Sequence, residues 1–141
     1  MRVLDASMTL AWLFKRADPA EASLATRALN QLPDTETLVP HIWFAEVANS
    51  VLRGERAGVV SSAQAAFFLE RLAASRIQVD SSSPWSAQSR AIDLARQHAL
   101  TAYDANYLEL AQRSQSELAT FDRRLAAAAR QAGIRVFGDA V

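Results

Sequence analysis

The sequence contains no cysteine, which excludes disulfide bonds, thiolate nucleophiles and zinc sites built from cysteine. It has only two histidines, His41 and His98, and their spacing does not indicate a zinc site. Any metal ion must therefore be held mainly by oxygen ligands. A chain without cysteine also fits a reducing compartment, so we expect this protein to act in the cytoplasm.

Signals for export or membrane insertion are also lacking. The first fourteen residues are apolar, but they include Asp5 and have neither a basic start nor a small-residue cleavage site. No apolar run approaches the roughly 20 residues that a membrane-spanning helix needs. We therefore expect neither a signal peptide nor a transmembrane segment.

The chain has no excess charge of either sign, because fifteen basic residues balance fifteen acidic ones. No global positive field is available to attract nucleic acid, so any contact with RNA must be local. Lys15 is the only lysine, and the other basic residues are all arginine. The forked guanidinium group suits contacts to phosphates or carboxylates, and composition does not distinguish the two.

Short apolar segments alternate with amphipathic ones along residues 1–141, which predicts one α/β domain. Parallel strands need helical crossovers, so the alternation predicts a three-layer α/β/α sandwich around a mostly parallel, five-stranded sheet. Strands are expected at residues 2–6, 37–39, 77–79, 118–121 and 135–137. Helices are expected at residues 7–16, 18–32, 42–53, 61–75, 85–98, 104–114 and 122–132. The helix at 42–53 is apolar on nearly every face, so we expect it to be largely buried.

Four acidic residues stand out against apolar surroundings. Asp5 and Asp122 end expected strands, Glu46 lies within the apolar helix at 42–53, and Asp104 begins a helix. Ionised carboxylates are seldom buried unless they are paired or bind metal, and ligands gather at the carboxyl ends of parallel strands. We therefore expect the four acids to converge on a hard divalent cation, Mg²⁺ or Mn²⁺, that supports phosphodiester hydrolysis.

Each acid also has a purely structural explanation. Asp5, Asp104 and Asp122 could cap the helices that follow them, because aspartate is strongly preferred at that position. Glu46 could be neutralised by an arginine inside the fold. The coincidence of four such residues is what favours a shared site.

Three further residues are candidates for a role beside the acids. Ser7 and Thr120 each lie two residues from an aspartate and could orient water or phosphate, although hydroxyls near helix starts are commonly caps. Arg123, followed by Arg124, begins the last expected helix near its positive end. It could attract phosphate or simply be exposed to solvent.

Four motifs along the chain carry a family resemblance. They are Val3-Leu-Asp5-Ala-Ser7, Pro40-x5-Glu46-Val-Ala-Asn49, Thr101-Ala-Tyr103-Asp104-Ala-x-Tyr107-Leu and Leu118-Ala-Thr120-Phe-Asp122-Arg123-x-Leu. Together they resemble the motifs of the PIN-domain ribonucleases and, within that family, of the VapC toxins of bacterial toxin-antitoxin pairs. The likeness spans essentially the whole chain.

The resemblance implies a site and partners. By this likeness the acids Asp5, Glu46, Asp104 and Asp122 bind one or two Mg²⁺ or Mn²⁺ ions in an RNA-cutting site, and Thr120 is its small hydroxyl residue. It also implies a homodimer and a VapB-like antitoxin whose C-terminal segment covers the active-site groove. It does not indicate which RNA is cut.

Two functions other than a nuclease are compatible with an acidic site in an α/β fold of this kind. A catalytically silent PIN-like module could use the same acids to dock a basic partner peptide. A phospho-receiver domain would need paired acids after the first strand and a lysine after the last, and the sequence has neither.

Overall fold

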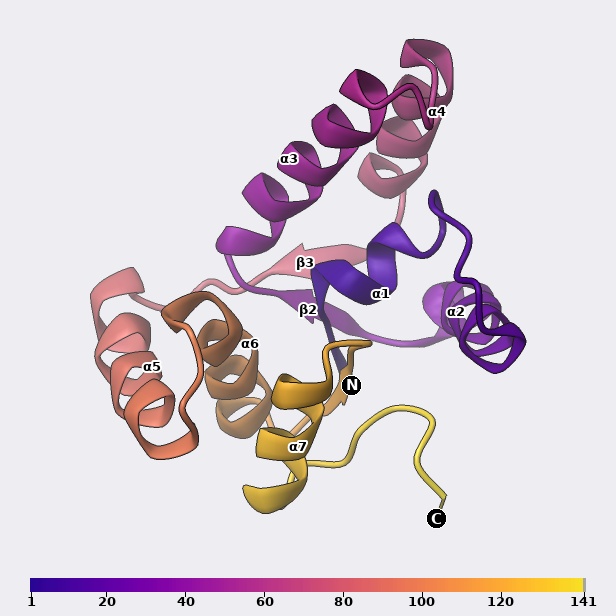
Figure 1. The fold of residues 1–141 in the computed structure, drawn as a ribbon. Coiled ribbons are helices and arrows are strands. Elements are labelled where there is room, and N and C mark those ends of the chain that lie inside the picture. The colour runs from indigo at the N-terminus through magenta and orange to yellow at the C-terminus, as the bar shows by residue number, and fades with distance from the viewer. Residues whose placement is uncertain (141) are drawn as a thin grey trace.

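Helices and strands alternate along the chain in a computed structural model that describes residues 1–140 (Figure 1). The strands are β1 (Arg2–Leu4), β2 (Thr37–Val39), β3 (Ile77–Val79) and β4 (Glu117–Ala119). The helices are α1 (Ala6–Leu10), α2 (Pro19–Gln31), the 3-10 helix η1 (Leu32–Asp34), α3 (Ile42–Arg56), α4 (Ser62–Ala73), α5 (Pro84–His98), α6 (Ala102–Arg113) and α7 (Arg123–Gln131).

The four strands form one parallel sheet in the order β3-β2-β1-β4. The central strand β1 aligns Val3 with Leu38 of β2 and with Leu118 of β4. The fifth strand, predicted at residues 135–137, is reduced to a single parallel bridge between Leu118 and Val136. The chain turns directly after this bridge, where Gly138 has a φ of 99°, so no further ladder can form.

The crossovers between strands divide the helices into two layers. The chain steps from β1 to β2 and on to β3 in one direction, then returns past β1 to β4. Because parallel crossovers are right-handed, α1 and α2 lie on one side of the sheet, from which α3 and α4 project, and α5 to α7 lie on the other side (Figure 1). The predicted α/β/α arrangement is confirmed, with four strands in place of five.

The apolar helix α3 is buried on one side only. Trp43, Val47 and Val51 face the core, but Phe44 is 51% exposed and Leu52 is also exposed. The prediction that this helix is largely buried was therefore wrong. The reason is its place in the fold: α3 packs against α1 and α4 and projects with α4 away from the sheet (Figure 1).

Helix ends mostly follow the capping residues in the sequence. Asp18 accepts a hydrogen bond from the Ala20 backbone at the start of α2, and Ser61 forms a capping box with Gln64 at the start of α4. The helix predicted at 7–16 ends earlier, because α1 stops at Leu10 and continues as turns. Among residues 1–140, no helix is both long and apolar enough to cross a membrane.

Candidate active site

The strand order reverses between β1 and β4, and parallel sheets commonly bind ligands at such a point, beyond the carboxyl ends of the strands. Asp5 directly follows β1, while Thr120 and Asp122 follow β4. The two strand ends are tied together, because the Asp5 backbone N–H donates to the carbonyl oxygen of Ala119 at 3.0 Å. Residues from opposite ends of the sequence therefore meet at one point of the sheet.

Two hydroxyl groups hold the carboxylate of Asp5, which is only 5% exposed. Ser7 Oγ and Thr120 Oγ1 both donate to Asp5 Oδ2, at 2.5 and 2.6 Å. The same hydroxyls accept the backbone N–H groups of Phe121 at 2.9 Å and Asp122 at 3.0 Å. Ser7 and Thr120 thus fix the Asp5 carboxylate and the loop after β4 in one network.

The capping explanation holds for Asp122 but not for Asp104. Asp122 Oδ1 accepts the backbone N–H of Leu125 at 2.8 Å, which makes it the N-cap of α7. Helix α6 is capped by Thr101, whose hydroxyl accepts the Asp104 N–H at 3.1 Å, so Asp104 lies in the first turn and is not the cap. Asp5 precedes α1 without making a side-chain cap bond.

Glu46 is anchored by a tyrosine and not by the arginine that the structural explanation required. Its Oε1 accepts the hydroxyl hydrogen of Tyr107 at 2.7 Å, and Tyr107 is completely buried. Helix α3 is fixed nearby, because Trp43 Nε1 donates to Thr9 Oγ1 at 3.0 Å and Thr9 Oγ1 donates to the backbone oxygen of Asp5 at 3.2 Å. These bonds set the distance between the Glu46 helix and the Asp5 strand.

The four acids Asp5, Glu46, Asp104 and Asp122, here called the four-acid site, influence each other's charge. Burial raises the pKa of Asp5, and the charge of Asp122 adds to the rise, while hydrogen bonds from Ser7 and Thr120 oppose it. Burial likewise raises the pKa of Glu46 and of Asp104, with further contributions from neighbouring acids of the site. For each of these three residues the raised pKa means that the hydrogen bonds to the carboxylate do not fully offset the cost of burying its negative charge beside other acids.

No cation in the described part of the chain supplies that compensation, since every ion pair found there involves other acids. Across residues 1–140, no three acidic or histidine side chains are close enough together to hold an ion between them as they stand. Proteins commonly bind Mg²⁺ through one or two carboxylates and retain several waters. A set of carboxylates and hydroxyls without a cationic partner fits a hard divalent cation of this kind.

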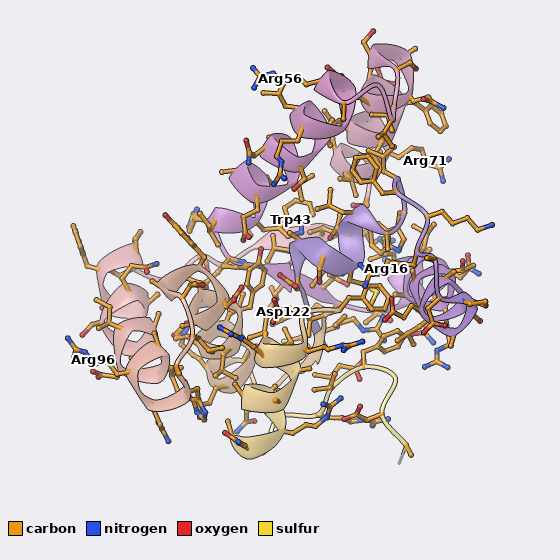
Figure 2. All side chains as sticks on the ribbon, viewed as in Figure 1. Arg16, Trp43, Arg56, Arg71, Arg96 and Asp122 are labelled. Carbon is orange, nitrogen blue, oxygen red and sulfur yellow. The ribbon has the colours of Figure 1, made fainter. Side chains whose placement is uncertain are left out.

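Two arginines lie close to residues that flank Asp122, one in the segment between α1 and α2 and one at the start of α7. The Arg16 guanidinium stacks 4.5 Å from the ring centre of Phe121, and its Nε donates to Glu21 at 2.8 Å (Figure 2). Since Phe121 directly precedes Asp122, Arg16 is held beside the loop that carries that acid. Arg123 begins α7 and is exposed, with no hydrogen bond or ion pair among the described residues.

Tyr107 was not identified from the sequence as a functional residue. Its position contains a usable signal, because Tyr107 lies three residues after Asp104 and thus on the same side of one helix. Burial raises the pKa of Tyr107 above its ordinary value, and the charges of Asp5 and Glu46 raise it further. The phenol therefore stays protonated and can act as a hydrogen-bond donor beside these acids.

Comparison with known proteins places this geometry in a family. The family model of the PIN domain matches residues 2–131. Ribonuclease VapC3 of Pyrobaculum aerophilum is 33% identical over 124 residues, which cover 88% of this chain and 91% of the relative.

Three solved structures share the fold at sequence identities below 25%. PAE2754 from Pyrobaculum aerophilum has a TM-score of 0.69 and 23% identity, covering 90% of this chain and 83% of its own. A toxin-antitoxin complex from Klebsiella pneumoniae gives 0.62 and 20%, covering 90% and 91%. FitAcB from Neisseria gonorrhoeae gives 0.64 and 21%, covering 98% and 97%. The resemblance expected from the sequence motifs is thus confirmed, and the chain belongs to the PIN domain family.

Proposed function

We propose that this protein is a VapC-type ribonuclease, the toxin component of a toxin-antitoxin pair, which hydrolyses RNA phosphodiester bonds with Mg²⁺ or Mn²⁺. The acids of the four-acid site, Asp5, Glu46, Asp104 and Asp122, hold the ion. A bound ion of this type polarises the phosphodiester and lowers the pKa of an attacking water. Ser7 and Thr120 keep Asp5 and the loop after β4 in place, and Arg123 contributes positive charge at the rim.

Several acids repel one another, without a cation between them, where the strand order of the parallel sheet reverses, and this arrangement is the main support for the proposal. Such an arrangement is unfavourable for the empty fold and becomes favourable when a cation binds. The similarity to a protein named as a ribonuclease supports RNA as the substrate. Because the net charge is zero, RNA must be held locally, and Arg16 beside Phe121 is placed to contact a phosphate.

A cleavage assay with labelled RNA tests the proposal. The purified protein should cut RNA in Mg²⁺ or Mn²⁺ and lose this activity in excess EDTA. Asp5→Asn and Asp104→Asn should each lower the cleavage rate by about 10²-fold or more, since each removes one charged ligand of the ion. Circular dichroism should show that both variants remain folded.

The matched control is Asp93→Asn, because Asp93 is 77% exposed on α5 and pairs only with Arg96. This variant should cut RNA at the wild-type rate. Cleavage that persists in EDTA, or in the Asp5 and Asp104 variants, would contradict the proposal. Calorimetry that detects no Mn²⁺ binding would instead favour the silent module that docks a basic peptide.

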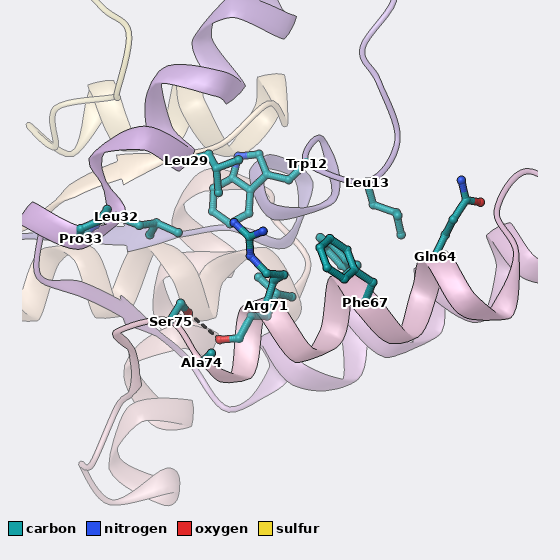
Figure 3. Close-up of a pocket in the computed structure, with 12 residues that line it drawn as sticks. Trp12, Leu13, Leu29, Leu32, Pro33, Gln64, Phe67, Arg71, Ala74 and Ser75 are labelled. Carbon is teal, nitrogen blue, oxygen red and sulfur yellow. Dashed lines mark hydrogen bonds between the residues drawn. The ribbon is translucent and has the colours of Figure 1, made fainter.

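Besides the active-site groove that the resemblance implies, the proposed antitoxin could contact an apolar groove of about 550 Å³ that contains none of the four acids (Figure 3). The groove is lined mainly by large apolar side chains, namely Trp12, Leu13, Leu29, Leu32, Phe67, Phe68 and Leu72. Figure 3 shows α4 presenting Gln64, Phe67 and Arg71 toward the segment after α1 and the end of α2. An apolar helix or strand of a partner could occupy this groove.

A substitution in the groove separates partner binding from catalysis. Phe67 is largely exposed, so Phe67→Asp should fold normally, weaken the complex with the antitoxin and leave RNA cleavage by the free protein unchanged. A short upstream gene whose product has a DNA-binding start and a basic, apolar tail would supply the antitoxin for this assay. Undiminished binding would show that the partner occupies another surface.

We further propose that the protein is a cytoplasmic homodimer in which residues 1–141 form one domain. The exposed apolar side chains Phe44 and Leu52 on α3 support association, because exposed large apolar groups clustered on one helix commonly mark an interface. Sedimentation should give twice the mass of 15.4 kDa for the wild-type chain and a shift toward monomer for Phe44→Asp. A wild-type monomer at micromolar concentration would refute the dimer.

A further inference from the structure

Three acids of the four-acid site share a pattern in their hydrogen bonds. Asp5 receives both of its hydroxyl donors on Oδ2, Asp122 receives the Leu125 N–H on Oδ1, and Glu46 receives the Tyr107 hydroxyl on Oε1. In each carboxylate one oxygen is therefore anchored by the protein. Carboxylates that ligate metal ions are usually held in this way by hydrogen bonds from the surrounding protein.

Glu46 needs such an anchor more than the two aspartates do. Its side chain has one more rotatable bond, it starts from a helix that is buried on one side only, and no arginine or lysine of the described chain pairs with it. Without a donor the carboxylate would be free to turn toward solvent. Tyr107 supplies the only hydrogen bond that Glu46 makes through its side chain among residues 1–140.

Tyr107 is well placed to hold a group in a fixed position. It is completely buried and lies on α6, which packs against β1 and β4, the two strands that lead into the site. The same helix carries Asp104 one turn earlier. One rigid helix can therefore present one acid directly and fix a second acid that belongs to another helix.

We propose that Tyr107 is a positioning residue whose hydroxyl anchors Glu46 Oε1, so that Glu46 presents its other oxygen, Oε2, to the divalent cation. This inference rests on the proposed metal-dependent function. It goes beyond that function by assigning a role to a residue that does not touch the ion. The loss expected on removing such an anchor is about 10- to 100-fold in metal affinity.

The test compares the only two tyrosines of the chain. Tyr107→Phe removes the anchoring hydroxyl and keeps the buried ring, and Tyr103→Phe makes the same chemical change on the same helix at a residue that is 62% exposed. Titration calorimetry of the metal-free proteins with Mn²⁺ should show affinity lowered at least tenfold by Tyr107→Phe and unchanged by Tyr103→Phe. RNA cleavage by Tyr107→Phe should need correspondingly more Mn²⁺ and approach the wild-type rate at saturation.

A double substitution distinguishes positioning from packing. In the Glu46→Gln background Tyr107→Phe should cause little further loss of Mn²⁺ affinity, because the carboxylate that it positions is gone. An undiminished loss in that background, or wild-type affinity in the single Tyr107→Phe variant, would overturn the proposal. A wild-type protein that binds no Mn²⁺ would refute the proposed function itself, which is a different result.

A measurement on the unaltered fold covers the case in which Tyr107→Phe does not fold. Incorporation of 3-fluorotyrosine gives one ¹⁹F resonance for each tyrosine, and Tyr103→Phe identifies which signal belongs to Tyr107. Addition of Mg²⁺ should shift the Tyr107 signal and leave that of Tyr103 in place. Binding of Mg²⁺ without a shift of the Tyr107 signal would overturn the proposal.

Discussion

Asp5→Asn should make the metal-free protein more stable, although it removes a residue central to the site. The amide keeps an acceptor oxygen for the hydroxyls of Ser7 and Thr120, and its NH₂ group can donate to a neighbouring carboxylate. The substitution removes a charge that is 95% shielded from solvent and faces Asp122 without a cation. The empty site should therefore be relieved of its most deeply buried charge.

The expected gain follows from opposing contributions. A hydrogen bond to a charged acceptor contributes about 1 kcal/mol more than one to a neutral acceptor, so two weakened bonds cost about 2 kcal/mol. The effective penalty of a buried ion is several kcal/mol, on the order of 4 kcal/mol here, and its removal more than offsets that loss. The net gain of about 2 kcal/mol corresponds to a rise in Tm of about 6 °C for a domain of this size.

The effect has a defined pH dependence. The folded-state pKa of Asp5 lies above its unfolded value of 3.8, so between these two values the folded state binds more protons than the unfolded state. The free energy of unfolding of the metal-free wild type therefore falls as pH rises through this window. Asp5→Asn lacks this contribution, so its advantage should be absent below pH 3.8 and fully present once pH exceeds the folded-state pKa.

Differential scanning calorimetry in EDTA and in Mn²⁺ provides the measurement. A ligand at 100 times its Kd stabilises the folded state by about 2.7 kcal/mol, so saturating Mn²⁺ should place the wild-type Tm above that of Asp5→Asn. The order of the two proteins should thus reverse between the two buffers. A lower Tm for Asp5→Asn in EDTA at pH 7.5, or no reversal with Mn²⁺, would refute the reasoning.

Three other substitutions test separate features. Hydrogen bonds from Arg113 overcome the effect of burial and lower the pKa of Asp80 to about 2, so Asp80→Asn should cost about 1–2 kcal/mol in urea unfolding at pH 7 and nothing below pH 2. Arg16→Ala should raise KM for RNA severalfold and leave kcat unchanged. It should also reduce the slope of log(kcat/KM) against log salt concentration by about 1. An unchanged slope would exclude a phosphate contact. Gly54→Ala would place Cβ 2.5 Å from Phe14 Cζ, so the variant should lose about 1–3 kcal/mol in free energy of unfolding and have a lower Tm. An unaltered Tm would show that the Phe14 ring can move aside.

The sheet could be predicted from the sequence because its strands are short apolar runs closed by polar residues. All four strands lie where those runs are, and the crossovers follow from the helices between them. The exposure of α3 could not be predicted, because an apolar helix without a polar face gives no sign of how many neighbours it will have. The failed fifth strand depended on the turn at Gly138, which its apolar residues do not encode.

The candidate site was predictable in its acids and less so in its supporting bonds. Asp5 and Asp122 are signalled by their place at strand ends, and Glu46 by its apolar helix. The hydrogen bond between Tyr107 and Glu46 joins residues 61 positions apart, so no local spacing rule reveals it. The spacing within α6 predicts only that Tyr107 lies on the same side of the helix as Asp104. Its contact with Glu46 depends on how α3 and α6 pack.

The hydrogen bond from Thr120 to Asp5 joins residues 115 positions apart, and β1 can pair with β4 only after residues 117–119 have been synthesised. During translation, a ribosome that has released residues 1–110 exposes Asp5, Glu46 and Asp104 but neither β4 nor Asp122. A nascent chain therefore cannot assemble the complete site. The Asp5 network with Thr120 and the charge of Asp122 are therefore added to the site only after residues 117–122 have left the ribosome.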